Sequence, residues 1–553
     1  MDNIVNVSVD AGKIVGNFKH TWNYIGYDEC NFTTSPGGRA LLGKFGALGD
    51  APFFVRPHHL LCTGNTIGEY KWGSTNVYTE DADGNPVYDF TTLDSICDTL
   101  IESGNKPFFE VGFMPRDLAD TRMAADGKSY KIVPRQSARD YQHVGFAMPP
   151  KDYQKWHDLI FAIVDHFVKR HGAGEVESWY FEMWNEPQIG NPYWKGSYDE
   201  FFKLYDYTEA AIHKALPGGR FGGPAVSKTQ EPDGPGAVMM DVFLNHCKNG
   251  VNYVTGETGA RLDFITWHVK GKPGGYGFTT HFVKEVPSVK IIVEQSRNII
   301  SFVKKYGYQD KEVVLSEADP DGWAAGGRFD NPNLNFRNTE YYASYVASGY
   351  KNTYDLAERE DMDIRPLAWA FMFDNERCFE GTRTFSTQGI DKAVFNLFKL
   401  YSRLGTRRLA LKSSMDVDPL VFKGSGGPGE CEIDGWATAK PDGSVQVLLY
   451  CHHDDFDEGR VFDVALDVKG LGGESVKLTH YRIDAEHSNA YAEWVRQGKP
   501  DYPAGAQYEA IKSRDGLELC EPQKTVALNA GALSHTFKLP THGISLIQID
   551  KSM

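Results

Sequence analysis

The sequence predicts an α/β fold in which a (β/α)₈ (TIM) barrel is followed by a C-terminal all-β sandwich domain. Between about residues 21 and 399, short β-rich runs alternate with helical patterns, which is typical of βα units around a parallel sheet. After about residue 405, alternating strand-like runs are separated by Gly, Pro and Asp turns, and helical periodicity largely disappears. A chain of 553 residues can hold one large barrel and one further unit.

Eight β-rich runs supply the strands of the predicted barrel, which is the number at which this fold closes. In chain order they lie near residues 22–26 and at residues 53–56, 107–113, 177–184, 220–222, 262–268, 312–315 and 367–373. The clearest helix precedes the fourth run and has one apolar face, formed by Trp156, Leu159, Ile160, Ile163, Val164, Phe167 and Val168. No Gly-x-Gly-x-x-Gly nucleotide fingerprint follows any of these runs.

The domain boundaries follow from these patterns. Residues 16–404 form the predicted catalytic barrel, and residues 405–553 form the β-sandwich, with alternating runs such as 445–450 and 545–549. Residues 4–9 also alternate but lie ahead of the barrel. We therefore expect residues 1–15 to supply an N-terminal strand that pairs with the sandwich.

Composition and charge exclude several classes of partner. The 58 basic and 74 acidic side chains give a net charge of −16, which repels nucleic acid and anionic membranes. No run of 18 apolar residues occurs, and the first 13 residues lack the apolar core of a signal peptide, so we expect a cytoplasmic protein. The eight cysteines show no metal-ligand spacing and are interpreted as free thiols. We expect the protein to use no metal and no cofactor. Both a monomer and a homo-oligomer are compatible with the sequence.

Two buried strands are predicted to end in a glutamate. Glu186 follows the run Trp179-Tyr180-Phe181-Glu182-Met183-Trp184-Asn185, and Glu317 follows Val313-Val314-Leu315-Ser316. By our count these are strands four and seven, whose C-terminal ends face across the mouth of a barrel. The two carboxyl groups can then approach to about 5 Å, the separation that retaining glycoside hydrolysis uses.

This chemistry needs one ionised and one protonated carboxyl group. We assign Glu317 as the nucleophile and Glu186 as the general acid and then base, and we expect the charge of Glu317 to raise the pKa of Glu186. Asn185 is expected to hydrogen-bond the 2-hydroxyl of the sugar. Either glutamate alone could merely cap a loop, but two such strand ends together favour the catalytic interpretation.

The motifs resemble those of glycoside hydrolase family 39, which includes β-D-xylosidases and α-L-iduronidases. The Trp-Asn-Glu-Pro segment at Glu186 looks like the acid/base motif of the large clan of retaining (β/α)₈ glycosidases. The resemblance covers nearly the whole chain, and its other segments are Val55-Arg56-Pro57-His58, residues 107–113, Gly222-Gly223-Pro224, the Glu317 segment, Tyr481-Arg482-Ile483-Asp484 and His487-Ser488-Asn489-Ala490-Tyr491. It implies that His58 reaches the hydroxyls of the bound sugar.

Several segments are more similar to the iduronidase branch. His268 is followed two positions later by Lys270, where xylosidases usually have Tyr, and by resemblance this lysine meets the uronate carboxylate. A buried sugar carboxylate needs a cation, whereas xylose has no C6 carboxylate. Substrate contacts are also expected at His268, and resemblance assigns further ones to Gly322, Trp323, Asp374 and Arg383, with Arg377 as the alternative to Arg383. The loop before Gly322 is one residue shorter than in iduronidases, and Lys270 could instead be a solvated loop lysine.

The sequence thus predicts a retaining, exo-acting glycosidase that removes a terminal sugar from an oligosaccharide or glycoside. An α-L-iduronidase-like activity is the leading hypothesis, and β-D-xylosidase activity on xylo-oligosaccharides is the alternative. A non-catalytic carbohydrate-binding protein and a metal-dependent hydrolase using His58 and His59 are weaker hypotheses, because neither needs a pair of glutamates and Asn185 at strand ends.

Overall fold

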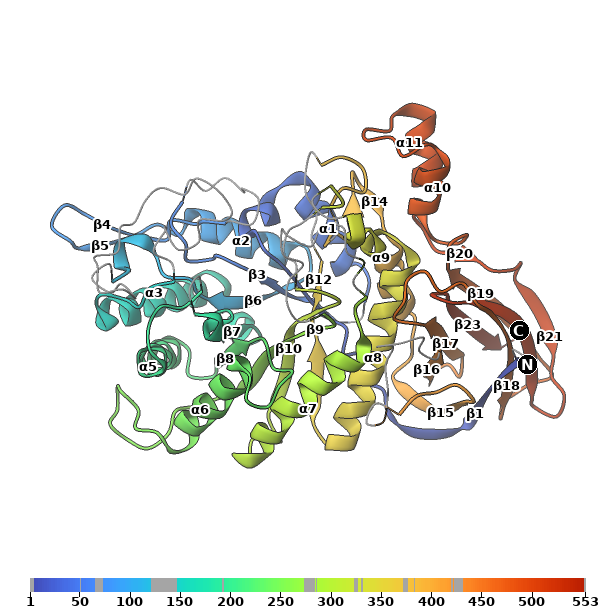
Figure 1. Cartoon of the computed structure of the whole chain (residues 1–553), viewed down its shortest axis with the longest axis horizontal. Helices are drawn as coiled ribbons and strands as arrows, with labels where there is room; N and C mark the ends of the chain where they lie inside the picture. Colours follow the sequence, from blue (N-terminus) through green and yellow to red (C-terminus); the bar gives the residue numbers. More distant parts are fainter. Residues whose placement is uncertain are drawn as a thin grey trace.

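The computed structural model describes residues 4–49, 51–64, 73–120, 147–190, 193–272, 284, 286–322, 327–329, 332–370, 376–381, 383–418, 421 and 431–551. Figure 1 shows a barrel ringed by helices and, beside it, a β-sandwich that carries both chain ends. Among the described helices, none is both long enough and apolar enough to cross a membrane.

The predicted α/β class and barrel are confirmed. The parallel sheet has the order β11-β10-β9-β8-β7-β6-β3-β2-β12. Its strands are β2 (Tyr24–Tyr27), β3 (Phe54–Pro57), β6 (Lys106–Val111), β7 (Tyr180–Met183), β8 (Arg220–Val226), β9 (Phe264–Lys270), β10 (Glu312–Asp319), β11 (Asp363–Pro366) and β12 (Ala368–Trp369). β11 pairs with β10 and β12 pairs with β2, so these two segments act as one eighth strand, interrupted at Leu367, that closes the barrel.

The observed ends of the barrel strands differ from the predicted ones by up to four residues; β8, for example, continues to Val226. The eighth strand begins at Asp363, four residues before the predicted run, because Asp363 is held in the sheet by ion pairs with Arg365 and Lys19. The seventh strand continues to Asp319, and the fourth begins only at Tyr180, after the short helix α4 (Ala173–Val176). Apolar runs therefore indicate the strands but not their exact ends.

Helices on the outside of the barrel follow the expected alternation. They are α1 (Pro36–Gly46), α2 (Thr91–Glu102), α3 (Tyr153–His171), α5 (Tyr198–Ala215), α6 (Pro235–Asn249), α7 (Val289–Lys305), α8 (Glu340–Glu360) and α9 (Ala393–Tyr401). The Asp152 carboxylate caps the start of α3, and Gly172, at φ 87°, ends it. Ser197 and Glu200 form a capping box at the start of α5. Short hairpins pair β4 (Tyr78–Glu80) with β5 (Pro86–Tyr88) and β13 (Ser386–Thr387) with β14 (Ile390–Asp391).

The sandwich is built from one folded sheet of order β20-β19-β23-β17-β16-β15-β1-β18-β22, with β21 also paired to β19. Its strands are β1 (Ile4–Asn17), β15 (Arg407–Ser413), β16 (Glu432–Ala439), β17 (Val445–His452), β18 (Val461–Lys469), β19 (Ser475–Ile483), β20 (Glu518–Leu519), β21 (Lys524–Ala527), β22 (Leu533–Pro540) and β23 (Ile544–Lys551). β1 lies between β15 and β18, antiparallel to the first and parallel to the second. Two helices that the sequence pattern did not indicate, α10 (Ala490–Arg496) and α11 (Gly505–Lys512), project from the sandwich (Figure 1).

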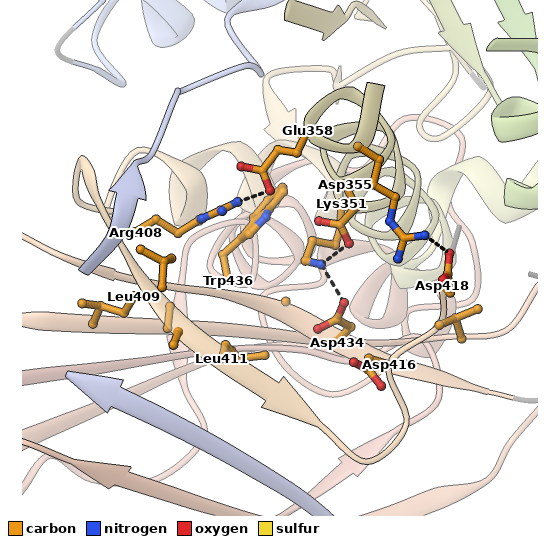
Figure 2. A pocket seen from close by; sticks show the side chains of 16 residues that line it. Lys351, Asp355, Glu358, Arg408, Leu409, Leu411, Asp416, Asp418, Asp434 and Trp436 are labelled. Atoms are coloured by element: carbon orange, nitrogen blue, oxygen red, sulfur yellow. Dashed lines mark hydrogen bonds and ion pairs between the residues drawn. The ribbon is translucent and has the colours of Figure 1, made fainter. Parts of the chain in front are cut away.

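The barrel and the sandwich share an apolar interface. Helices α8 and α9 pack on one side against the barrel and on the other against residues such as Trp436, Leu448 and Leu546 of the sandwich. Between α8, β15 and β16 lies a cavity of about 770 Å³ whose side chains are drawn in Figure 2. Lys351 lies there between Asp355 and Asp434, at 2.5 and 2.7 Å. This buried ion pair joins a barrel helix to the sandwich.

Candidate active site

Two glutamates meet at the C-terminal mouth of the barrel. Glu186 follows β7 in a left-handed conformation, φ 47° and ψ 46°, and its amide donates to the Ala225 carbonyl at 2.9 Å. Glu317 lies within β10, where the register with β9 shifts between Leu315 and Glu317. One carboxylate oxygen of each glutamate and one ring nitrogen of His268 all lie within 4.8 Å of one another.

Arg56, at the end of β3, forms the buried floor beneath these glutamates. Its guanidinium donates to Glu182, contacts Glu110 at 2.9 Å and Glu317 at 3.4 Å, and donates to Asn185 Oδ1 at 3.1 Å. Glu110 and Glu182 are directly opposite each other on β6 and β7, where two like charges would repel. Arg56 neutralises this pair and so makes two buried carboxylates tolerable below the mouth.

His58 is fixed between two carboxylates. Its Nδ1 lies 2.5 Å from Glu110 Oε2 and its Nε2 lies 3.3 Å from Glu317 Oε1, with Asp28 at 4.0 Å. Burial lowers the pKa of His58, but the charge and the hydrogen bond of Glu110 outweigh it and raise that pKa to about 9. The imidazole is therefore protonated at neutral pH, forming an ion pair with Glu110 and a hydrogen bond with Glu317.

Glu186 is paired with His268, which the sequence analysis did not anticipate. His268 Nδ1 lies 2.8 Å from Glu186 Oε1 and 3.7 Å from Glu317 Oε1. Burial raises the pKa of Glu186, and so does the charge of Glu317, as expected. The hydrogen bond and charge of His268 outweigh both, so the pKa of Glu186 is lowered in the free site. The expectation of a raised pKa was wrong, because a strand-six partner that lies far away in the chain dominates.

Glu317 is held ionised by the groups around it. Burial by itself raises the pKa of Glu317, but the charges of His268 and Lys270 and the contact with His58 hold it well below its usual range. Lys270 Nζ lies 2.5 Å from Glu317 Oε2. Burial lowers the pKa of Lys270, and the charges of Asp319 and Glu317 outweigh this and raise it, so the lysine stays charged.

Lys270 also belongs to a cluster of cations at the rim. Its ammonium contacts Asp319 Oδ2 at 2.8 Å, and Arg383 contacts the same oxygen at 2.9 Å. Arg337 pairs with Asp321 at 2.9 Å and approaches Asp319 at 3.5 Å. Because Lys270 is only 9% exposed, its interpretation as a solvated loop lysine was wrong.

The structure also separates the two candidate arginines. Arg383 is buried within this cluster, and the guanidinium approaches Asp28 at 4.0 Å. Arg377 instead pairs with Glu380, three residues away on the surface, and lies over the ring of Phe329. Of the two, only Arg383 lies with Lys270.

The remaining candidates divide into those the structure places and those it does not describe. Asn185 is buried, and because a guanidinium donates to its Oδ1, its amide NH₂ is left to donate elsewhere. Gly322 is exposed directly after Asp321, and a Cβ atom built there would meet no atom within 4 Å. Trp323 and Asp374 lie outside the described residues.

The two adjacent histidines of the metal hypothesis face different partners. His58 contacts carboxylates, whereas His59 Nδ1 contacts Cys62 Sγ at 3.5 Å and its ring stacks on Phe113. Glu186, His268 and Glu317 are close enough to share an ion, but the Lys270 ammonium and the Arg56 guanidinium already lie against Glu317. These positive charges oppose a metal cation in the same place.

The model of glycosyl hydrolases family 39 matches residues 54–527. The chain belongs to this family. Family 39 membership makes the protein a glycosidase that acts on glycoside substrates.

Curated relatives in family 39 carry two activities. A β-xylosidase from Geobacillus stearothermophilus is 24% identical over 512 residues, covering 90% of this chain and 86% of the relative. Human α-L-iduronidase is 24% identical over 485 residues, covering 82% of this chain and 65% of the iduronidase.

Solved family 39 structures share the fold. A bacterial orthologue of human α-L-iduronidase aligns with a TM-score of 0.77 at 21% identity, covering 100% of this chain and 85% of that one. A monomeric β-xylosidase from Caulobacter crescentus CB15 aligns with a TM-score of 0.75 at 20% identity, covering 99% and 100%. The fold alone therefore does not choose between the two activities.

Proposed function

We propose that this family 39 glycosidase is a retaining, exo-acting enzyme that uses Glu317 as nucleophile and Glu186 as acid/base. The observation that carries the proposal is the separation of the two carboxylates, whose nearest oxygens lie within 4.8 Å. Retaining enzymes hold these groups about 5–5.5 Å apart, and inverting enzymes need roughly 6.5–9.5 Å to admit a water. The observed separation therefore matches the retaining arrangement rather than the inverting one.

The charges around the two carboxylates suit unequal roles. Lys270, His58 and His268 hold Glu317 ionised, which is the state needed to attack the anomeric carbon. As the Glu317 ester forms, the leaving oxygen takes a proton from the pair formed by Glu186 and His268 at 2.8 Å. Glu186 then removes a proton from water, which attacks the anomeric carbon and breaks the ester. Asn185 directs its free NH₂ toward the 2-hydroxyl.

For the sugar, we propose a terminal α-L-iduronide. Lys270 and Arg383 are both buried beside the nucleophile and converge on one oxygen of Asp319. Arg383 Nε is buried and has no hydrogen-bond partner among the described residues. An unpaired buried donor is costly, and a substrate carboxylate would satisfy it. When Glu317 becomes an ester it loses its charge, and Lys270 can then turn to that carboxylate.

β-D-xylosidase activity is the second candidate, and one observation favours it. Asp319 and Glu317 already neutralise Lys270, and Asp319 also pairs with Arg383, so the free site holds balanced charges. A neutral pentose can bind there without a further carboxylate. Under this alternative the cations only fix Glu317 in place.

A parallel assay separates the two candidates. The full chain is assayed with aryl α-L-iduronide, aryl β-D-xyloside and aryl α-L-arabinoside, and kcat/KM is compared. The iduronidase proposal expects the uronide to exceed both pentosides by at least about a hundredfold, the discrimination expected when a paired buried charge is lost. A xyloside preferred over the uronide would exclude it. The anomeric configuration of the first-formed sugar is measured by NMR. A retained configuration supports the two-step mechanism, and an inverted configuration would contradict it.

A further inference from the structure

A second cluster of metal-ligating side chains lies in the sandwich, away from the barrel mouth. His480 on β19, His535 on β22 and Glu521 after β20 bring one ligand atom each to within 4.8 Å of one another. β19 lies next to one end of the folded sheet, and β22 is its other end, so the sheet brings strands from its two ends together here.

Both histidines occupy positions that otherwise carry apolar residues. β22 buries alternate residues, Leu533, His535, Phe537 and Leu539, and β19 buries Val476, Leu478 and His480 in the same alternation. Histidines at such inward positions present ring nitrogens, which are common metal ligands, to the interior of the sandwich.

Two of the three distances between the ligand atoms match tetrahedral coordination, and the third lies within 4.8 Å. His480 Nδ1 lies 3.4 Å from His535 Nε2, which lies 3.3 Å from Glu521 Oε1. A Zn²⁺ ion with bonds of about 2.0–2.1 Å holds tetrahedral ligands about 3.3–3.4 Å apart. Two histidines, one glutamate and a water are a common zinc set.

Hydrogen bonds among the three side chains do not satisfy all of their polar atoms. His535 Nε2 hydrogen-bonds His480 Nδ1, while Glu521 Oε1 is buried and has no hydrogen-bond partner among the described residues. The single N–H proton of a neutral His535 ring cannot form good hydrogen bonds to His480 Nδ1 and Glu521 Oε1 at the same time. A cation bound by all three atoms would satisfy each of them at once.

The surroundings hold the ligands in place. His480 Nε2 contacts Ser545 Oγ at 3.0 Å, the kind of outer contact that orients a metal-binding imidazole. The loop bearing Glu521 is tied to β19 on both sides, by Cys520 N to the His480 carbonyl at 2.8 Å and by Gln523 Nε2 to Thr479 Oγ1 at 2.6 Å. Lys524 pairs with the outer oxygen, Glu521 Oε2, and leaves Oε1 facing the histidines.

We propose that His480, His535 and Glu521 form a structural zinc site that joins strands from the two ends of the sandwich sheet. The site is independent of glycoside cleavage, so its failure would leave the proposed function untouched. Zinc binding would stabilise the folded sandwich, since the ligands are brought together only by folding.

The test uses the full untagged chain after chelation and desalting. With ZnCl₂ added and excess removed, metal analysis is expected to find one zinc per chain, and the thermal midpoint is expected to rise by several degrees. Glu521→Gln, on a partly exposed loop, is expected to bind at least about tenfold more weakly and to lose the rise in midpoint. His535→Gln should behave in the same way. Co²⁺ in place of Zn²⁺ should show the intense visible bands of tetrahedral coordination.

Two control variants locate the metal. His487→Gln changes a surface histidine of the same domain, and Glu317→Gln changes the other cluster of potential ligands. Both are expected to keep one zinc per chain. The proposal is overturned if the wild-type chain retains no zinc, if Glu521→Gln binds it as tightly as the wild type, or if Glu317→Gln alone loses it.

Discussion

The ammonium of Lys270 lies 2.5 Å from Glu317 Oε2, so a cation on strand six contacts the carboxylate on strand seven. The same ammonium lies 2.8 Å from Asp319. Lys270 can therefore act in two ways: it keeps Glu317 ionised, and it offers a positive charge to a substrate carboxylate. The two effects are separable by experiment because the first acts on every substrate and the second only on uronides.

Glu317→Gln is expected to lower kcat by at least about 10³-fold, because an amide cannot form the glycosyl ester. The isosteric side chain leaves Arg56 its contacts with Glu110 and Glu182, so the fold should persist. Turnover is measured beside circular dichroism and thermal unfolding. A folded variant with near-normal kcat would exclude Glu317 as the nucleophile.

Glu186→Ala is expected to lose about 10²–10⁴-fold in kcat on substrates with poor leaving groups. An aryl glycoside with a good leaving group needs no protonation and should recover the first step. Azide, which needs no general base, should restore turnover of the ester and yield a glycosyl azide of retained configuration. If neither recovery is seen in a folded variant, Glu186 is not the acid/base.

Lys270→Met is expected to reduce kcat/KM for uronides about tenfold to a hundredfold more than for xylosides. Loss of this charge also lets the pKa of Glu317 rise, so the acidic limb of the pH profile should move to higher pH with either sugar. Lys305→Met, at an exposed surface pair, is the control. Equal losses on both sugars would leave Lys270 as a positioning residue for Glu317 only.

Arg383→Gln is expected to raise KM for uronides about tenfold or more, because a buried guanidinium beside the sugar site is removed. Arg377→Gln is the matched control and should change KM less than about twofold, since its pair with Glu380 lies at the surface. Steady-state kinetics on the uronide measure both. A larger effect at Arg377 would reverse the assignment.

Because of His58, the free energy of unfolding should fall as the pH rises into the alkaline range. Its pKa is raised from 6.5 to about 9 in the folded protein, so its contribution is complete below pH 6.5 and is lost as pH rises through 9. The shift corresponds to at most about 3 kcal/mol. Urea unfolding across this range should show a difference between wild type and His58→Gln that shrinks with rising pH. A constant difference would contradict the charged state of His58, and His487→Gln is the surface control.

The sequence predicts the barrel and the two glutamates because both leave local signals. An apolar run marks each inner strand, and Glu186 and Glu317 stand at or near the end of such a run. Strand ends are less predictable: the eighth strand begins at a charged residue, Asp363, which pairs with Lys19 and Arg365. Helices α10 and α11 bury few residues, among them Trp494 and Ile511, so their apolar periodicity is weak.

The charge network beneath the site has no local signal. Glu110 and Glu182 look like isolated polar residues within apolar strands until Arg56 from a third strand is placed between them. The pairing of Glu186 with His268 likewise depends on barrel closure, which brings strands four and six to one mouth. Charge pairs of this kind are set by tertiary contacts, so residue spacing cannot reveal the lowered pKa of Glu186.

The position of β1 has a consequence for synthesis. Ile4–Asn17 is made before the barrel, yet both of its neighbours, Arg407–Ser413 and Val461–Lys469, are made after the whole barrel. Until then its apolar residues Val5, Val7 and Val9 have no sheet to join, and an unpaired strand of this kind is prone to aggregate. We expect N-terminal fusions or truncations of β1 to lower the yield of folded protein even though they lie far from the mouth of the barrel.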